Sequence, residues 1–110
     1  MPTRPMGPEL LDLVADRFKA LSDRARLSLL QRLRQGPLTV NELADATGLG
    51  QANVSRHLSV LFSAALVSRT RDGTFVRYEL ADDDVLKLCD FMCNRLESEL
   101  ATRRKAVIGR

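Results

Sequence analysis

The chain has no tryptophan, one histidine, two cysteines, four phenylalanines and one tyrosine among its 110 residues. These few aromatic rings disfavour binding of single-stranded nucleic acid, whose bases stack on aromatic side chains. Two cysteines are too few for the disulfide framework of a small secreted domain, so a reducing compartment is the simpler assignment. One histidine, with no glycine-rich phosphate loop and no paired nucleophile and base, leaves little from which to build an active site. We therefore do not expect an enzyme.

Long apolar runs and a targeting segment are also missing. Residues 1–8 contain three prolines and one arginine but no apolar stretch, so they do not resemble a signal peptide. No window approaches the length of a membrane span, and we expect a cytoplasmic protein with no membrane partner. A chain of 110 residues fits one domain with a modest core. Because small domains are often stabilised by association, the length already suggests a dimer.

Positive charge is modest in total but concentrated in one stretch. The chain has 17 Lys and Arg residues against 14 Asp and Glu residues, a net charge of +3. Between Gly50 and Tyr78 lie Arg56, three further arginines and one acidic residue, so the balance there is also +3. Such a cluster suits binding to phosphate groups. Each phosphate that it neutralises should steepen the fall of log affinity with log salt concentration by about one. The alternative is a solvated hairpin edge that its charges guard against aggregation.

The first part of the chain predicts four helices. Apolar residues at helical spacing and a Ser-Asp cap predict helices over 9–21 and 22–35. Thr39 and Glu42 form a T-x-x-E capping box that starts a third helix. A short turn with two glycines separates that helix from the fourth, over 51–64. Two short helices joined by a glycine-containing turn match the helix-turn-helix pattern.

A hairpin and a last helix are predicted after these. Asp72-Gly73 is a strong type I′ turn signal, and the flanking residues of 67–80 alternate between apolar and polar. Asp82-Asp83-Asp84 supplies a cap for a final helix that ends in Arg103-Arg104-Lys105, which is the charge order that the helix dipole favours.

These elements predict a fold that is mainly α with a β-hairpin wing, in the order of four helices, a hairpin and a helix. We expect one winged helix-turn-helix domain over 9–105. A disordered N-terminal tail over 1–8 and a short C-terminal tail over 106–110 are expected to flank it.

Several motifs in this order are shared with a known family. They are Phe18-Lys19-Ala20-Leu21-Ser22-Asp23-Arg24-Ala25-Arg26-Leu27, Glu42-Leu43-Ala44, Val54-Ser55-Arg56-His57-Leu58, Ala65-Leu66-Val67, Asp72-Gly73 and Tyr78-Glu79-Leu80. On these segments, within 9–100, the chain resembles the ArsR/SmtB family of winged-helix repressors. The resemblance implies a homodimer built from the first and last helices, with recognition helices in successive major grooves of an imperfect palindrome. It also implies that metal, metalloid or thiol chemistry on the protomer releases the DNA.

The fourth helix carries the residues predicted to read double-stranded DNA. Gln51, Asn53 and Ser55 can donate and accept hydrogen bonds at base edges, and Arg56 can reach guanine or phosphate. Ser59 belongs to the same polar set. The alternative is that these residues only solvate an exposed helix face.

Four further residues are predicted to contact the DNA. The hairpin is expected to bring Arg69, Arg71 and Arg77 together as a phosphate-binding patch. His57 has two open roles, which are contact with a phosphate and packing between helices, because a lone histidine is weak support for a metal site.

Cys89 and Cys93 lie four residues apart in the apolar stripe of the last helix. Two thiolates at that spacing can share a soft ion such as As(III), Cd(II) or Zn(II), and a dimer brings four sulfurs near one axis. Equally, a free cysteine in an apolar stripe behaves as a small packing residue. A disulfide between them within one helix is not expected, since the two side chains start about 6 Å apart. Cross-subunit bonding, oxidation and persulfide chemistry stay open.

The chain differs from the family at the positions that bind the inducer, the ligand that releases the DNA. Residues 42–47 lack the cysteines of the arsenic- and cadmium-responsive members, and the last helix lacks histidine, so neither familiar metal site carries over. Cys89 and Cys93 are the only thiolates available, with Asp90 or a partner group completing a metal shell. The sequence therefore predicts a dimeric repressor with a thiol sensor at this pair. The alternatives are a ligand-independent regulator and a protein-only interaction module.

Overall fold

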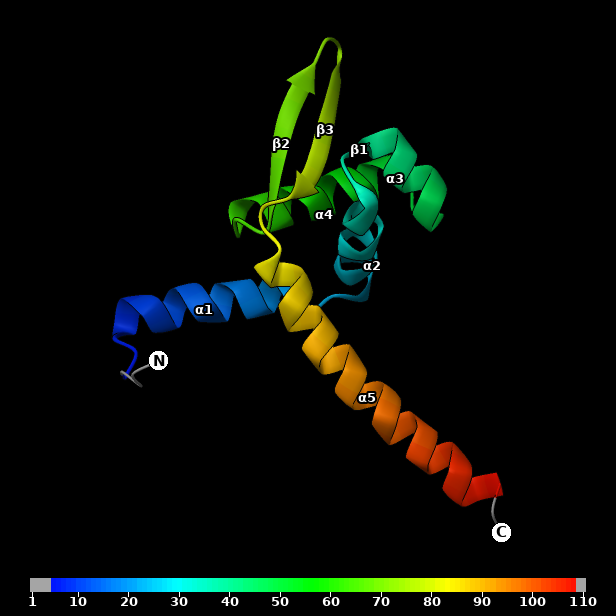
Figure 1. Ribbon diagram of the computed structural model, residues 1–110. Coiled ribbons are helices and arrows are strands. Elements are labelled where there is room, and N and C mark those ends of the chain that lie inside the picture. The colour runs from blue at the N-terminus through cyan, green and yellow to red at the C-terminus, as the bar shows by residue number, and fades with distance from the viewer. Residues whose placement is uncertain (1–4, 109–110) are drawn as a thin grey trace.

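The computed structural model describes residues 5–108 and confirms the predicted fold class, which is mainly helical with a β-hairpin wing (Figure 1). Its elements are α1 (Pro8–Leu21), α2 (Arg24–Arg32), the 3-10 helix η1 (Leu33–Gln35), β1 (Leu38–Thr39), α3 (Val40–Thr47), α4 (Gln51–Ser63), β2 (Val67–Asp72), β3 (Phe75–Leu80) and α5 (Asp84–Ile108). The sequence did not predict β1. Its two residues are too few to show an alternating pattern, but they pair with β3 and complete a three-stranded antiparallel sheet in the order β1-β3-β2.

The core lies where α2, α3, α4 and the base of the sheet meet. Its fully buried side chains are Leu29, Leu30, Leu43, Val54, Leu58 and Leu61. Because these residues come from three consecutive helices, the core fixes the helix-turn-helix unit as one body. Each fully buried leucine or valine stabilises that body by about 1.5–3 kcal/mol relative to an exposed one.

Local signals in the sequence fix the ends of the helices in this unit. The predicted capping box at α3 is present, since Glu42 N–H donates to Thr39 Oγ1 and Thr39 N–H donates to Glu42 Oε1. Gly48 ends α3 in the left-handed region, at φ 75°. A side chain there costs about 1–2 kcal/mol of backbone strain, which explains the glycine. Ala65, just after α4, adopts a similar conformation at φ 59°.

The two terminal helices extend away from this body in Figure 1. The radius of gyration is 17.0 Å, whereas a compact chain of this length has about 13 Å. Large apolar side chains remain exposed along both helices, namely Leu10, Leu11, Leu13, Phe18, Leu88, Phe91, Met92, Leu96, Leu100 and Val107. The protomer therefore has apolar surface on α1 and α5 that the described residues do not cover.

Both predicted tails differ from the structure at their inner ends. α1 already begins at Pro8, because proline is tolerated in the first helical turn. α5 continues to Ile108, because Ala106 and Val107 do not interrupt a helix. Residues 1–4, 109 and 110 of the predicted tails lie outside the described residues. No helix within 5–108 combines the length and the apolar character that crossing a bilayer requires.

Candidate nucleic-acid interface and thiol site

The exposed face of α4 carries the predicted base-reading residues. Val54, Leu58 and Leu61 are fully buried at 0% exposure, so they anchor the inner face of the helix. The outer face exposes Gln51, Asn53, Ser55, Arg56 and Ser59. Gly50, the N-cap residue, provides no side-chain cap to the first amides of α4. This end of the helix therefore presents N–H groups and a positive dipole end, both of which favour a phosphate.

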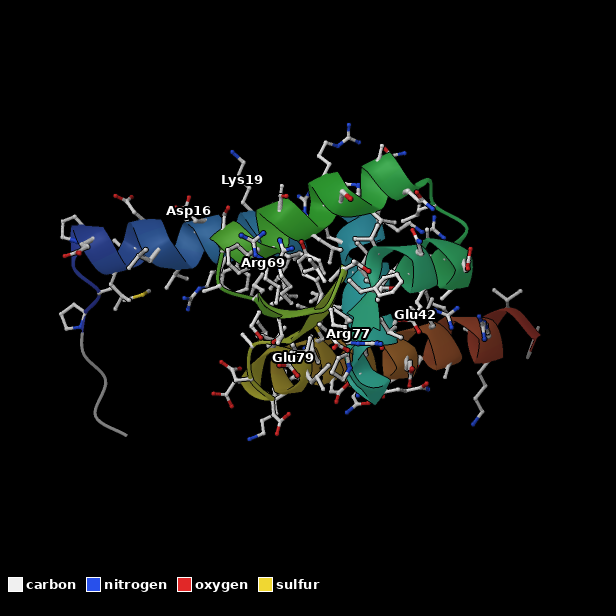
Figure 2. All side chains as sticks on the ribbon, turned by 90° about the horizontal axis from the view of Figure 1, so that it is seen from above. Asp16, Lys19, Glu42, Arg69, Arg77 and Glu79 are labelled. Carbon is white, nitrogen blue, oxygen red and sulfur yellow. The ribbon has the colours of Figure 1, made fainter. Side chains whose placement is uncertain are left out.

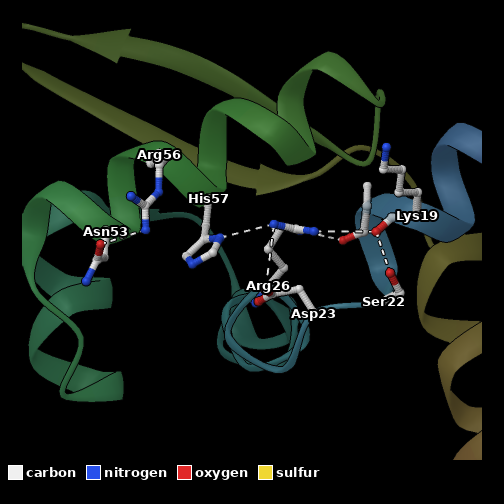
Figure 3. A network of polar contacts seen from close by, with 8 residues as sticks. Lys19, Ser22, Asp23, Arg26, Asn53, Arg56 and His57 are labelled. Atoms are coloured by element: carbon white, nitrogen blue, oxygen red, sulfur yellow. Dashed lines mark hydrogen bonds and ion pairs between the residues drawn. The ribbon is translucent and has the colours of Figure 1, made fainter.

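Two of these residues already contact each other. Arg56 Nη2 donates a hydrogen bond of 2.9 Å to Asn53 Oδ1, one helical turn away, and both side chains are exposed (Figure 3). The bond limits the rotamers of the guanidinium. It also leaves the other guanidinium N–H groups and the Asn53 amide group free to face a ligand.

His57 is turned toward the inside of the protein rather than toward the exposed face. Its Nδ1 lies 3.3 Å from Arg26 Nη1, and its side chain is half-buried. Because arginine can only donate, Nδ1 is the acceptor in this contact. Arg26 also donates to the Ala20 carbonyl (2.6 Å) and lies 3.9 Å from the Asp23 carboxylate (Figure 3). Of the two roles left open for His57, this geometry favours packing between helices.

The register of the hairpin separates the wing arginines. Arg69 pairs with Tyr78 and Arg71 with Val76, whereas Arg77 pairs with Thr70. Directly opposed residues share a face of the sheet, so Arg69 and Arg71 lie on one face and Arg77 on the other. The expectation that the hairpin brings all three together was wrong, because the pleat alternates sides at each residue.

The two faces have different surroundings, which Figure 2 shows from above. Arg69 lies over the ring of Phe62 at 4.1 Å from its centroid, a cation–π contact with the end of α4. Arg77 lies 3.5 Å from Glu42 Oε1 and 3.4 Å from Asp72 Oδ2. It therefore ties β3 to the capping box of α3, which sequence reasoning missed.

Glu42 is held as a carboxylate by this arrangement. The Thr39 backbone N–H is the main group that lowers the pKa of Glu42, and the Thr39 hydroxyl and Arg77 lower it further. Arg77 is thus partly neutralised within the protomer, whereas Arg71 forms no ion pair among the described residues.

The two cysteines differ in environment. Cys89 is half-buried and Cys93 is exposed, and both are free thiols. Burial is the main cause that raises the pKa of Cys89, with the neighbouring Cys93 and Asp90 adding to it and Arg34 opposing it. Residues 5–108 contain no group of three or more His, Cys, Asp or Glu side chains placed to hold a metal ion. One protomer therefore supplies two sulfurs but not a complete shell.

Sequence reasoning also missed the partner of Asp90, the residue that follows Cys89. Arg34 Nη1 donates to Asp90 Oδ2 at 3.3 Å, and Arg34 Nη2 donates to Oδ1. This bidentate ion pair raises the pKa of Arg34. The two residues are 56 positions apart, so only the fold brings them together.

Known proteins resemble the chain over most of its length. The family model described as bacterial regulatory protein, arsR family, matches residues 23–69. The transcriptional regulator NmtR of Mycobacterium tuberculosis (strain ATCC 25618 / H37Rv) is 39% identical over 89 residues, which cover 81% of this chain and 74% of NmtR. The arsenical resistance operon repressor of Bacillus subtilis (strain 168) is 36% identical over 78 residues, covering 70% of this chain and 74% of that repressor.

A solved structure agrees with these relatives. The homodimeric winged helix-turn-helix DNA-binding domain of Mb0332 from Mycobacterium bovis, a possible ArsR-family transcriptional regulator, superimposes with a TM-score of 0.80. It is 34% identical, and the match covers 91% of this chain and 93% of that one. The chain therefore belongs to the arsR family of bacterial regulatory proteins and is a transcriptional regulator with a winged helix-turn-helix fold, not an enzyme.

Proposed function

We propose that the protein is a homodimeric repressor that binds double-stranded operator DNA through α4 and the wing. The observation that carries this proposal is the division of α4, whose apolar face is fully buried while its polar face and uncapped N-terminus are exposed. A helix of this kind fits the major groove, where base edges differ between all four base pairs. The similar Mycobacterium bovis structure is that of a DNA-binding domain, which supports the same function here.

The exposed apolar residues of α1 and α5 support the homodimer. Phe18 on α1 is 55% exposed and Met92 on α5 is 58% exposed, and neighbouring apolar residues extend both patches. Contiguous apolar surface of this kind marks an interaction site on a soluble protein. A two-fold dimer places its two copies of α4 about 34 Å apart, which is one turn of DNA. We therefore expect the operator to be an imperfect palindrome.

The contacts divide into three groups. Gln51, Asn53, Ser55 and Arg56 meet base edges, with Ser59 at the margin of the groove. Arg69 and Arg71 meet phosphates from one face of the wing. Arg77 and His57 mainly stabilise the helix-turn-helix, because Arg77 pairs with Glu42 and His57 contacts Arg26 within the protomer.

Operator binding can be tested by fluorescence anisotropy with the DNA upstream of the protein's own gene. Arg56→Ala should weaken binding by about 10- to 100-fold if it reads a base edge. Arg71→Ala should weaken binding to all sequences and reduce the salt slope by about one. Lys87→Ala, which removes an exposed positive charge from α5, serves as the control. Absence of binding at low salt would contradict the proposal.

We further propose that Cys89 and Cys93 sense a soft ion, As(III), Cd(II) or Zn(II), or an oxidising sulfur species. Their spacing supports it, as does the arsenical resistance named for the Bacillus subtilis relative. The missing ligands would come from the partner subunit or from Asp90. Release should be blocked in Cys89→Ser while operator binding stays intact.

The second candidate is a regulator without an inducer, in which the cysteines only pack. The half-burial of Cys89 and the raised pKa of its thiol favour this alternative, because the thiol is then less often ionised at neutral pH. In that case the double variant Cys89→Ala/Cys93→Ala should change thermal stability but not DNA release. Titrating both proteins on the operator with each ion, peroxide and polysulfide separates the two candidates.

A further inference from the structure

The tip of the wing exposes a large apolar side chain. Phe75, the first residue of β3, is 58% exposed and follows the turn at Gly73. Its partner across the hairpin is Asp72, whose side chain offers an aromatic ring little apolar surface to pack on. In Figure 1 the hairpin projects away from α1 and α5, the helices that carry the proposed dimer interface. That interface therefore does not account for the exposure of Phe75.

The hairpin is long enough to reach a second groove of the DNA. Val67, the first residue of β2, belongs to the core, and Asp72 at the tip lies five residues further along the strand. At about 3.3 Å per residue, the tip is about 17 Å from the core. On DNA with a turn of about 34 Å, a major groove and the next minor groove are also about 17 Å apart. With α4 in the major groove, the wing tip therefore comes to the neighbouring minor groove.

The minor groove admits a side chain of the tip but not the hairpin itself. The groove is about 6 Å wide, and two paired strands lie about 4.8 Å apart before their side chains are counted. The side chains available at the tip are those of Asp72, Thr74 and Phe75. Phosphates on both sides of the groove repel the carboxylate of Asp72, and the side chain of Thr74 is short. Phe75 is long and apolar, the kind of residue that enters a minor groove by wedging between base pairs.

The charges around the tip favour the same approach. Arg71 lies opposite Val76, on the other face of the hairpin from Phe75, and forms no ion pair among residues 5–108. A hairpin that points into a groove turns one face toward each DNA strand. Arg71 can therefore bind a phosphate of one strand while Phe75 faces the bases. The Asp72 carboxylate lies 3.4 Å from Arg77 Nε, so its repulsion of phosphate is reduced within the protomer.

We propose that Phe75 wedges between two base pairs in the minor groove beside each half-site and bends the operator there. This inference rests on the operator binding proposed above. Insertion separates two stacked base pairs and kinks the duplex by about 20–90°. Pyrimidine–purine steps such as TA and CA unstack most easily, so Phe75 selects such a step about half a turn from the bases that α4 contacts. The wing then contributes to the choice of operator sequence without a hydrogen bond to any base.

The wedge is tested on the full-length protein with duplex DNA from upstream of its own gene. 2-Aminopurine, whose fluorescence rises when it is unstacked, replaces one adenine at a time across the protected region. With saturating protein, the fluorescence should rise at a TA or CA step about half a turn from the α4 contacts. Phe75→Ala should abolish this rise and weaken binding by about fivefold or more, as expected when a ring stacked on a base is removed.

Two matched variants separate the ring from other properties of the tip. Phe75→Leu keeps an apolar wedge, so it should keep most of the fluorescence rise and of the affinity. Thr74→Ala changes the neighbouring side chain of the tip but leaves the ring, so it should keep both. Gel-shift assays with circularly permuted DNA should show a bend with the unmodified protein, Phe75→Leu and Thr74→Ala, and a smaller one with Phe75→Ala.

Two results would overturn the wedge while operator binding stays intact. One is a fluorescence rise in Phe75→Ala equal to that of the unmodified protein. The other is that no adenine of the protected region responds to the unmodified protein. Absence of any binding at low salt would instead contradict the proposed function, and the wedge with it. Circular dichroism melts check the fold of each variant, and Phe75→Thr, with a better strand former than alanine, replaces Phe75→Ala if that variant unfolds.

Discussion

At the scale of single residues, Arg26 joins three helices. Its guanidinium donates to the carbonyl at Ala20 near the end of α1, lies beside Asp23 at the cap of α2, and meets His57 Nδ1 on α4. The backbone N–H of Arg26 is the main group that lowers the pKa of Asp23. The residue thus connects α1 to α4 through hydrogen bonds to the Ala20 carbonyl and to His57.

His57→Ala should distinguish the two roles considered for this histidine. Loss of the acceptor for Arg26 should lower the free energy of unfolding by about 1 kcal/mol, and His57→Asn, whose Oδ1 can accept in place of Nδ1, should recover part of it. Thermal melts measure the stability, and anisotropy should show a smaller loss of operator affinity than for Arg56→Ala. Normal stability with a loss of affinity as large as that of Arg56→Ala would instead indicate a phosphate contact.

The exposed residues of α4 could be predicted from the sequence because helical periodicity alone decides which positions face outward. The roles of His57 and Arg77 could not. Their partners, Arg26 and Glu42, lie 31 and 35 residues away, and only tertiary packing brings them within reach. The same holds for Arg34 and Asp90.

At the scale of elements, the capping box at α3 joins the helix-turn-helix to the sheet. Thr39 is a strand residue of β1 and also the N-cap of α3, and Glu42 binds both Thr39 and Arg77. Its two capping residues were predictable because they lie only three positions apart in sequence, in the T-x-x-E pattern. β1 itself was not, since it is a strand only through its pairing with β3.

Acid should weaken this junction. The pKa of Glu42 is lower in the folded protein than in the unfolded chain, so its contribution to stability is present at neutral pH. That contribution is lost as the pH falls from the ordinary glutamate pKa of about 4.3 toward the lower folded value. Denaturant titrations at neutral pH and at about pH 3 measure the free energy of unfolding. Between these two pH values, Glu42→Gln should lose less of it than the unmodified protein.

Thr39→Ala provides the matched test of the cap. It should lower the free energy of unfolding at neutral pH by about 0.5–2 kcal/mol, the usual loss when an N-cap hydroxyl is removed. Asp23, whose pKa is also lowered, supplies acid sensitivity that remains in both variants. If Glu42→Gln loses as much unfolding free energy in acid as the unmodified protein, the carboxylate interactions at α3 do not stabilise the fold.

At the scale of the whole molecule, the protomer is extended, because only Ala20 of α1 and Val85 of α5 join the core while large apolar side chains of both helices stay exposed within residues 5–108. The radius of gyration of 17.0 Å and the exposed apolar stripe of α5 both reflect this extended shape. The apolar spacing of α5 predicted this stripe. The packing of α5 on the rest of the protomer was not predictable, because its contacts, such as the ion pair between Arg34 and Asp90, join residues far apart in sequence.

A charge placed in that stripe should separate the proposed dimer. Leu96→Glu introduces a carboxylate at the centre of the apolar surface of α5, where burial without a partner is costly. Sedimentation should show a monomer. Operator affinity should fall by about tenfold or more, because a monomer binds the DNA through a single copy of α4. Glu97→Gln, at the next position along the helix, should stay dimeric. A Leu96→Glu protein that remains dimeric would place the interface elsewhere.

The uncovered apolar surface of α1 and α5 also makes repression depend on the rate of synthesis. If two protomers must meet before either one is covered, the amount of dimer rises with the square of protomer concentration while most protomers are free. Halving production then lowers operator occupancy by up to about fourfold. A cell could therefore switch the target genes steeply by modest changes in the abundance of this protein.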